Sequence, residues 1–96
     1  MIDYDKVPVE YMRDTTRNYI ENGFNGGSFI TALFSNNLAK TYSLADDENR
    51  AVIKEWVSFL YNSAPAGCWG SKENVQAWIE DGGTTGRYKK KELSDI

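Results

Sequence analysis

Apolar residues recur at intervals of three and four positions in three stretches of the chain, a spacing typical of amphipathic α-helices. The first predicted helix begins at Val7-Pro8, because proline is tolerated at the first helical position, and it ends at Asn22-Gly23. The second covers 46–61 and is the most hydrophobic, with an apolar surface wider than one stripe. The third follows Ser71, which can cap it, and ends at Asp81-Gly82-Gly83.

Two shorter helices are predicted between the first and second stretches. Ser28 can cap a helix over 29–34, and Asn36 can start another over 38–42. The tetrapeptide Ser43-Leu44-Ala45-Asp46 then fits a capping box ahead of the second long helix. Pieces this short are not stable alone, so packing against the longer helices must hold them. Because a short apolar run is ambiguous by periodicity, a strand over 29–34 is the alternative.

These patterns predict an all-α fold, a small compact bundle of about four to five helices, two of them short. Residues 1–83 form the predicted single domain, since a chain of 96 residues has room for one core. Residues 84–96 contain the basic run Lys89-Lys90-Lys91 and few apolar positions. We therefore expect a basic, flexible C-terminal tail.

Charge and hydropathy exclude several classes of partner. The net charge is −3 and the pI is near 4.8, whereas a binder of long nucleic acid needs a basic face that displaces counterions. No apolar run approaches membrane-spanning length, and Met1–Asp5 lacks a basic-then-apolar leader, so we expect no membrane partner and a soluble protein of a reducing cytoplasm. A small anionic ligand stays compatible with this charge, because one or two arginines can serve it locally.

The residue types that most often carry catalysis are scarce. The chain has no histidine, the commonest general base and metal ligand, and its single cysteine cannot form an intramolecular disulfide. We expect Cys68 to be a buried structural thiol, because a nucleophilic cysteine needs an activating neighbour. Helix-start electrostatics explain the acidic run Asp46-Asp47-Glu48 better than a bound cation does. The sequence therefore predicts no catalytic residue, no metal site, no cofactor and no enzyme activity.

Two helix starts preceded by glycine, at Gly27-Ser28 and Gly70-Ser71, are the features that indicate a ligand. Backbone amides at such positions can hold an anion, aromatic faces can stack on a base, and nearby cations can pair with phosphate. Simpler interpretations stay open for each feature, namely tight turns, a solvated helix face and an unstructured tail. The predicted ligand-binding residues are Arg13, Arg17, Gly27, Ser28, Trp69, Gly70, Ser71, Lys72, Arg87 and Tyr88.

Three segments resemble, in the same order, a widespread family of small proteins encoded by bacteriophages. They are Gly23–Leu38 (GFNGGSFITALFSNNL), Ala45–Arg50 (ADDENR) and Leu60–Trp78 (LYNSAPAGCWGSKENVQAW). Within this family the chain is similar to the viral sponge proteins that bind and sequester cyclic nucleotide signals of bacterial antiviral immunity. The resemblance implies binding of a cyclic nucleotide, without turnover, in the cytoplasm of the host cell. It supplies no ligand contacts position by position, so the candidate residues above rest on chemistry alone.

A domain this small would enclose a cyclic nucleotide better if two protomers shared the pocket, so we expect a homo-oligomer. Three other functions stay open. A helical protein–protein inhibitor or adaptor would use the broad apolar face over 46–61 to bind a host protein. A structural phage component and an enzyme that degrades the same signal are the others, and the enzyme would lack a visible general base. Recovery of an intact bound nucleotide separates sequestration from all three.

Overall fold

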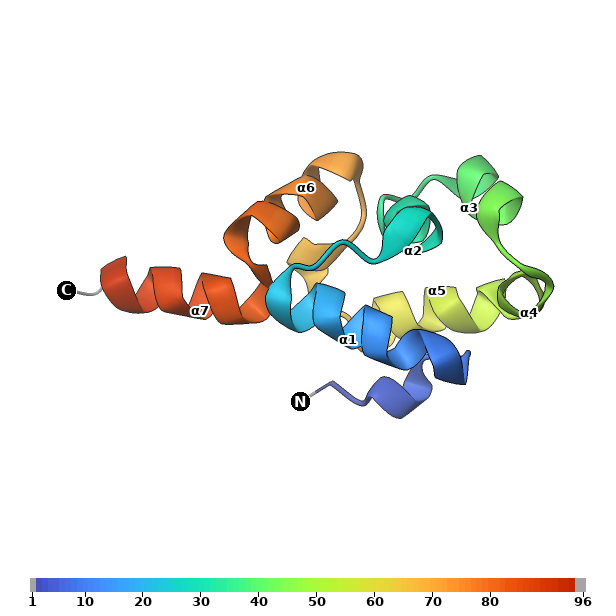
Figure 1. Ribbon diagram of the computed structural model, residues 1–96, viewed down its shortest axis with the longest axis horizontal. Coiled ribbons are helices and arrows are strands. Elements are labelled where there is room, and N and C mark those ends of the chain that lie inside the picture. Colours follow the sequence, from blue (N-terminus) through green and yellow to red (C-terminus); the bar gives the residue numbers. More distant parts are fainter. Residues whose placement is uncertain (1, 95–96) are drawn as a thin grey trace.

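The structure is a computed structural model that describes residues 2–94, with side chains as far as Lys90, and this part of the chain contains helices and no strand (Figure 1). The all-α prediction is confirmed, and 29–34 is helical. The α-helices are α1 (Arg13–Asn22), α2 (Gly27–Phe34), α3 (Leu38–Leu44), α4 (Asp47–Ala51), α5 (Ile53–Asn62), α6 (Lys72–Asp81) and α7 (Gly83–Ser94). Three 3₁₀ turns are η1 (Tyr4–Lys6), η2 (Glu10–Met12) and η3 (Ala66–Cys68).

The first long helix begins later than its periodicity predicts. Val7 and Val9 both have extended backbone conformations, and α1 starts only at Arg13. This path buries both valine side chains, which are 0% and 1% exposed. Burial of a valine side chain contributes about 1.5–3 kcal/mol, more than a helix gains at β-branched positions. The predicted start at Val7-Pro8 is therefore wrong, whereas the predicted end is confirmed by Gly23, whose left-handed φ is 71°.

Ser28 does not cap the N-terminal end of α2. Gly26 is the N-cap residue and offers no side chain, while Asn25 Oδ1 accepts the Gly27 amide at 2.8 Å. Gly27 has a φ of 90°, a conformation that glycine adopts at low cost. The chain therefore turns into the helix before Ser28, and the prediction of Ser28 as the cap is wrong.

The next two helix starts are also displaced along the chain. Asn37, rather than Asn36, caps α3, because Asn36 sits in the left-handed region with a φ of 63°. Asp46 caps α4 by accepting the Asn49 amide at 2.8 Å. Ser43 lies inside α3, so the predicted capping box that begins there is wrong.

The most hydrophobic stretch forms two helices, because Val52 (φ −123°, ψ 29°) interrupts it between α4 and α5. Asn49 is 3% exposed, and its Oδ1 accepts the indole N–H of the buried Trp56 at 3.0 Å. Asn49 Nδ2 donates to Tyr11 Oη at 3.1 Å and to Asp46 Oδ1 at 3.0 Å, and Tyr11 donates to Asp46. A buried indole needs such an acceptor, and this network joins the N-terminal segment to both helices.

The core is rich in aromatic side chains. Trp56, Tyr19 and Phe34 are fully buried, and the Tyr19 and Phe34 rings meet edge to face with centroids 5.1 Å apart. The Tyr19 hydroxyl donates to the Cys68 carbonyl at 2.7 Å. Cys68 is 0% exposed, which confirms the prediction of a buried thiol. Burial raises the pKa of this thiol to about 12, so it stays protonated.

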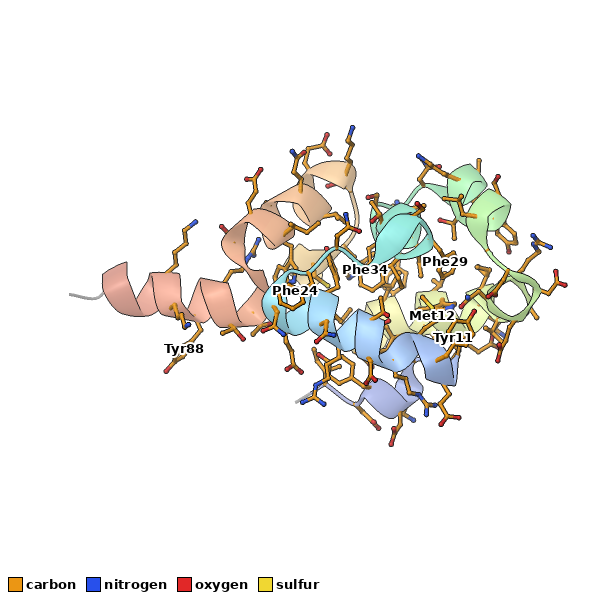
Figure 2. All side chains as sticks on the ribbon, viewed as in Figure 1. Tyr11, Met12, Phe24, Phe29, Phe34 and Tyr88 are labelled. Atoms are coloured by element: carbon orange, nitrogen blue, oxygen red, sulfur yellow. The ribbon has the colours of Figure 1, made fainter. Side chains whose placement is uncertain are left out.

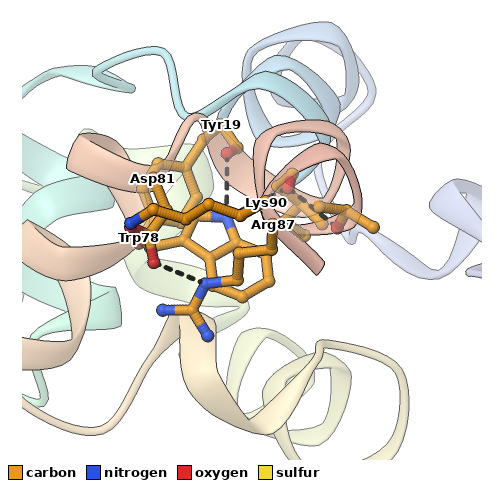
Figure 3. A network of polar contacts seen from close by, with 7 residues as sticks. Tyr19, Trp78, Asp81, Arg87 and Lys90 are labelled. Carbon is orange, nitrogen blue, oxygen red and sulfur yellow. Dashed lines mark hydrogen bonds and ion pairs between the residues drawn. The ribbon is translucent and has the colours of Figure 1, made fainter. Parts of the chain in front are cut away.

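Helix α6 has the boundaries that its sequence predicts, with Ser71 as its N-cap and Gly82 in the left-handed region at its end. Trp78 fixes this helix to α1 (Figure 3). Its indole N–H donates to the carbonyls of Tyr19 at 3.2 Å and Ile20 at 3.0 Å. The Tyr19 carbonyl also accepts the Gly23 amide at 2.9 Å, whereas the Ile20 carbonyl lies in the last turn of α1, where carbonyl groups lack intrahelical partners. The Trp78 side chain therefore pairs with the end of α1 while packing in the core.

The basic segment beyond residue 83 is helical, which its few apolar residues do not predict. It forms α7, which extends away from the other helices (Figure 1). Polar contacts anchor its start: the Arg87 guanidinium lies 4.4 Å from the Trp78 ring centroid, and Arg87 Nε lies 3.1 Å from Asp81 Oδ2 (Figure 3). Lys90 Nζ pairs with Asp81 Oδ1 at 2.8 Å.

The projection of α7 makes the molecule elongated, with extents of 48 × 25 × 19 Å (Figure 1). The side chain of Lys91 and residues 95–96, which belong to the predicted tail, lie outside the described part of the chain. Among the described residues, no helix is both long enough and apolar enough to cross a membrane.

Candidate functional site

A groove of about 500 Å³ lies beside α2 and reaches the starts of α3 and α6. Gly27 and Ser28 line it from the first turn of α2, Asn37 and Lys40 from the start of α3, and Lys72 from the start of α6. The other lining residues are uncharged: Asn25, Thr31, Ala32 and Ser35. We call this site the polar groove. It brings together three of the predicted ligand-binding residues, Gly27, Ser28 and Lys72.

Both charged residues that line the polar groove are lysines. Lys40 and Lys72 are exposed or partly exposed, and neither ammonium group pairs with a carboxylate in the described part of the chain. Lys72 is the first residue of α6, where a positive charge opposes the helix dipole. Helix stability therefore does not explain this lysine. The groove concentrates positive charge on a chain whose net charge is −3, and its chemistry suits an anion.

The start of α2 adds hydrogen-bond donors to the groove. Its N-cap Gly26 makes no side-chain cap, and its first turn contains no acidic residue. The Asn25 side chain accepts the hydrogen bond of the Gly27 amide, whereas Ser28 is exposed and lines the groove. Because the N-terminal end of a helix carries partial positive charge, this turn supports the two lysines in attracting an anion.

The second predicted helix start is occupied by the protein itself. The Gly70 amide donates to the Phe34 carbonyl at 2.8 Å, so this amide already has a partner within the protein. Ser71 Oγ accepts the Asn74 amide at 3.1 Å and acts as the cap of α6. Neither Gly70 nor Ser71 lines the polar groove. Their contacts instead attach the turn that precedes Lys72 to the C-terminal end of α2.

The two arginines of α1 do not reach the polar groove. Arg13 donates to the carbonyls of Val7 at 3.3 Å and Asp5 at 3.1 Å, which ties the N-terminal segment to α1. Arg17 pairs with Glu21 at 3.3 Å along the same helix. Neither arginine lines the groove, so the structure does not bring them together with Gly27, Ser28 and Lys72.

The two candidates on α7 are likewise separate from the polar groove. Arg87 is engaged by Trp78 and Asp81, contacts that hold α7 against α6. Tyr88 is 67% exposed and lies on the projecting helix, away from the rest of the chain (Figure 2). The structure therefore does not bring Arg87 and Tyr88 together with the residues that line the polar groove.

Trp69 lines a second hollow next to the polar groove. We call it the aromatic hollow; it lies between α3, α5 and the turn before α6, and Asn37 lines both cavities. The Trp69 ring meets Tyr61 edge to face, with centroids 5.2 Å apart. Trp69 is partly buried at the edge of the core rather than deep within it, so it is accessible to a ligand.

Lys40, Asn37 and Tyr61 are site residues that the sequence does not predict. Asn37 and Lys40 have the spacing of an N-cap and the residue whose amide it accepts, a local signal that places Lys40 at a helix start. No local pattern pairs Lys40 with Lys72, or Tyr61 with Trp69. The members of each pair come from different elements, and only packing brings them together.

The described residues contain no group of three or more acidic or cysteine side chains placed to hold a metal ion, the run Asp46-Asp47-Glu48 included. Comparison of the chain with protein-family models, with curated proteins and with solved structures yields no match.

Proposed function

We propose that this protein binds a small phosphorylated ligand, a cyclic nucleotide, in the polar groove and holds it without cleavage. In this proposal it is an anti-defence protein of a bacteriophage that sequesters the immune signal in the cytoplasm of the host cell. The observation that carries the proposal is the convergence of Lys40 and Lys72 in one groove whose lining includes no carboxylate.

The dimensions and donors of the polar groove suit such a ligand. Its volume of about 500 Å³ is within the range of about 300–1,000 Å³ that small-molecule sites occupy. Lysine ammonium groups bind phosphate oxygens as point charges, and each phosphate of a cyclic dinucleotide could take one. The side chains of Asn25, Ser28 and Asn37 add neutral hydrogen-bonding groups around the two lysines.

Several features favour sequestration over turnover. The groove is lined by amides, hydroxyls and lysines, with no histidine or carboxylate to act as a general base. The chain contains no histidine at all. Cys68 is buried and its raised pKa of about 12 keeps the thiol protonated, so it is a poor nucleophile. Tight binding needs none of these groups.

Self-association is part of the proposal, because a 96-residue domain encloses a cyclic nucleotide more completely when a second protomer covers the groove. Sedimentation velocity with and without nucleotide tests this part separately. A species that stays monomeric at every concentration, with nucleotide bound, would restrict the proposal to a one-protomer site.

The direct test is a thermal shift series with cyclic di-AMP, cyclic di-GMP, cyclic GMP–AMP and cyclic triadenylate. We expect at least one to raise the melting temperature, because ligand at 100 times its Kd stabilises the folded state by about 2.7 kcal/mol. The bound nucleotide should be recovered intact by chromatography after the protein is denatured. Calorimetric titration of Lys40→Gln and Lys72→Gln should show affinity at least about tenfold weaker for each, since each loses a charge-assisted contact.

Lys54→Gln is the matched control, because Lys54 is an exposed lysine of α5 that does not line the polar groove. If all three variants lost the same amount of nucleotide affinity, the binding would be a non-specific attraction between charges, which would contradict the proposal. Recovery of a cleaved product would make the protein an enzyme. Absence of any shift, together with binding of a host polypeptide, would favour the alternative of a helical protein–protein inhibitor or adaptor.

A further inference from the structure

The aromatic hollow has a volume of about 240 Å³ and walls of a different character from those of the polar groove. Its large apolar lining residues are Leu33, Leu38, Ile53, Val57, Leu60, Tyr61 and Trp69. Tyr61 is 74% exposed and Leu38 is 70% exposed. Leu38, Val57 and Tyr61 are exposed around the hollow, with the partly buried Trp69 beside them, whereas Leu33, Ile53 and Leu60 are buried. Exposed apolar side chains gathered around one hollow indicate a binding surface.

The two cavities are held in a fixed relationship. Trp69 lines the aromatic hollow and Lys72 lines the polar groove, and the two residues are three positions apart at the turn into α6. The bond from the Gly70 amide to the Phe34 carbonyl, 2.8 Å long, attaches this turn to the end of α2. Asn37 completes the connection because it lines both cavities. A cation and an indole are therefore presented side by side by one short segment.

We propose that the aromatic hollow binds a nucleobase of the ligand whose phosphate lies in the polar groove. The base stacks on the ring system of Tyr61 and Trp69. Asn37 Nδ2 donates to an acceptor on its edge, while Asn37 Oδ1 accepts the Lys40 amide as the cap of α3. This inference rests on the proposed function and makes it more specific. It assigns the ligand class as molecules that carry an aromatic base and a phosphate together, and it excludes sugar phosphates and inorganic phosphates as tight ligands.

The geometry of the aromatic hollow supports one ring system rather than a whole ligand. Its volume of about 240 Å³ is smaller than the lower limit of about 300 Å³ for complete small-molecule sites. The Tyr61 and Trp69 planes lie at 71° to each other, an edge-to-face pair in which the exposed Tyr61 ring is available to a further ring. Stacking on such a face tolerates any base, so specificity among bases falls to Asn37.

The test compares cyclic di-AMP, cyclic di-GMP and cyclic GMP–AMP with pyrophosphate and ribose 5-phosphate as base-free probes. Trp56 and Trp78 are buried, so nucleotide binding should quench the emission of Trp69, and the base-free probes should not. Tyr61→Ala should weaken nucleotide affinity about tenfold and leave pyrophosphate affinity unchanged. Tyr61→Phe should retain the affinity, because it keeps the ring. Tyr42→Ala is the control for loss of an exposed tyrosine, because Tyr42 is an exposed residue of α3 that lines neither cavity.

The outcomes separate this inference from the proposed function. If nucleotides bind but Tyr61→Ala has no effect and Trp69 is not quenched, the inference is overturned while sequestration in the polar groove stands. If Tyr61→Ala weakens pyrophosphate and nucleotide equally, Tyr61 acts on the fold and the inference is also overturned. Oligomers that Tyr61→Ala dissociates would assign the hollow to a second copy of the chain. If no nucleotide binds, both proposals fail together.

Discussion

The backbone of Gly83 lies directly against the backbone of Gly23, where the end of α1 meets the start of α7. A Cβ atom at Gly23 would come within 2.7 Å of Gly83 N, and one at Gly83 would come within 2.6 Å of Gly23 N. Both residues have a positive φ, 71° for Gly23 and 69° for Gly83. Two chain segments far apart in the sequence therefore touch at a point that only glycine can occupy on either side.

Gly83→Ala should destabilise the fold more than backbone strain alone explains. An alanine in the left-handed region costs about 1–3 kcal/mol, and here its methyl group would also collide with the backbone of α1. The free energy of unfolding, measured by urea denaturation, should fall by more than that amount. Gly27→Ala is the matched control, because Gly27 also has a positive φ, 90°, but a methyl group there would point into open space. Equal losses in the two variants would contradict the close approach.

Asn49→Ala should also destabilise the protein, because Asn49 accepts the hydrogen bond of the Trp56 indole. The variant leaves the Trp56 indole N–H buried without its acceptor, and a buried donor without a partner costs about 1–3 kcal/mol. Urea denaturation should show a lower midpoint with an unchanged slope. Asn62→Ala is the control, since Asn62 is exposed and its side chain bonds to Ser58 of the same helix, and its effect should stay within about 0.5 kcal/mol. If both variants lowered the free energy of unfolding by a similar amount, the hydrogen bond between Asn49 and Trp56 would not be a special source of stability.

Acid should weaken the fold through Asp81. The hydrogen bond from Lys90, with the charges of Lys90 and Arg87, lowers the pKa of Asp81 in the folded state. A carboxyl group with a lowered folded pKa stabilises the protein above its unfolded pKa, which is about 3.9 for aspartate, and this contribution is lost as the pH falls through the folded pKa.

Melting temperatures measured from pH 7 to pH 2 should therefore drop below about pH 4, and Asp81→Asn should make that drop smaller. Asp46 adds to the same drop, because the hydrogen bond from Tyr11, with the Asn49 amide, lowers its pKa. Glu80→Gln, at the exposed neighbouring position of α6, is the control. Its melting temperature should fall with pH in the same way as that of the wild type. An acid profile unchanged by Asp81→Asn would show that α7 is not held by this ion pair.

Features that depend only on neighbouring residues could be predicted from the amino-acid sequence. Ser71 caps α6, glycines end α1 and α6, and the helical periodicity establishes an all-α fold, because each depends on backbone and side-chain preferences within about one turn. The burial of Cys68 also follows from local chemistry, since nothing near it in the sequence activates a thiol.

Features that depend on contacts between distant segments of the chain could not be predicted, because packing in three dimensions determines their free energy. The late start of α1 reflects core burial of Val7 and Val9, and α7 is helical where its start is held by Gly23 and by the Trp78 ring. The same reason applies to the polar groove. Lysines from α3 and α6 meet in it because packing of α2 aligns two helix starts, and no spacing along the chain records that alignment.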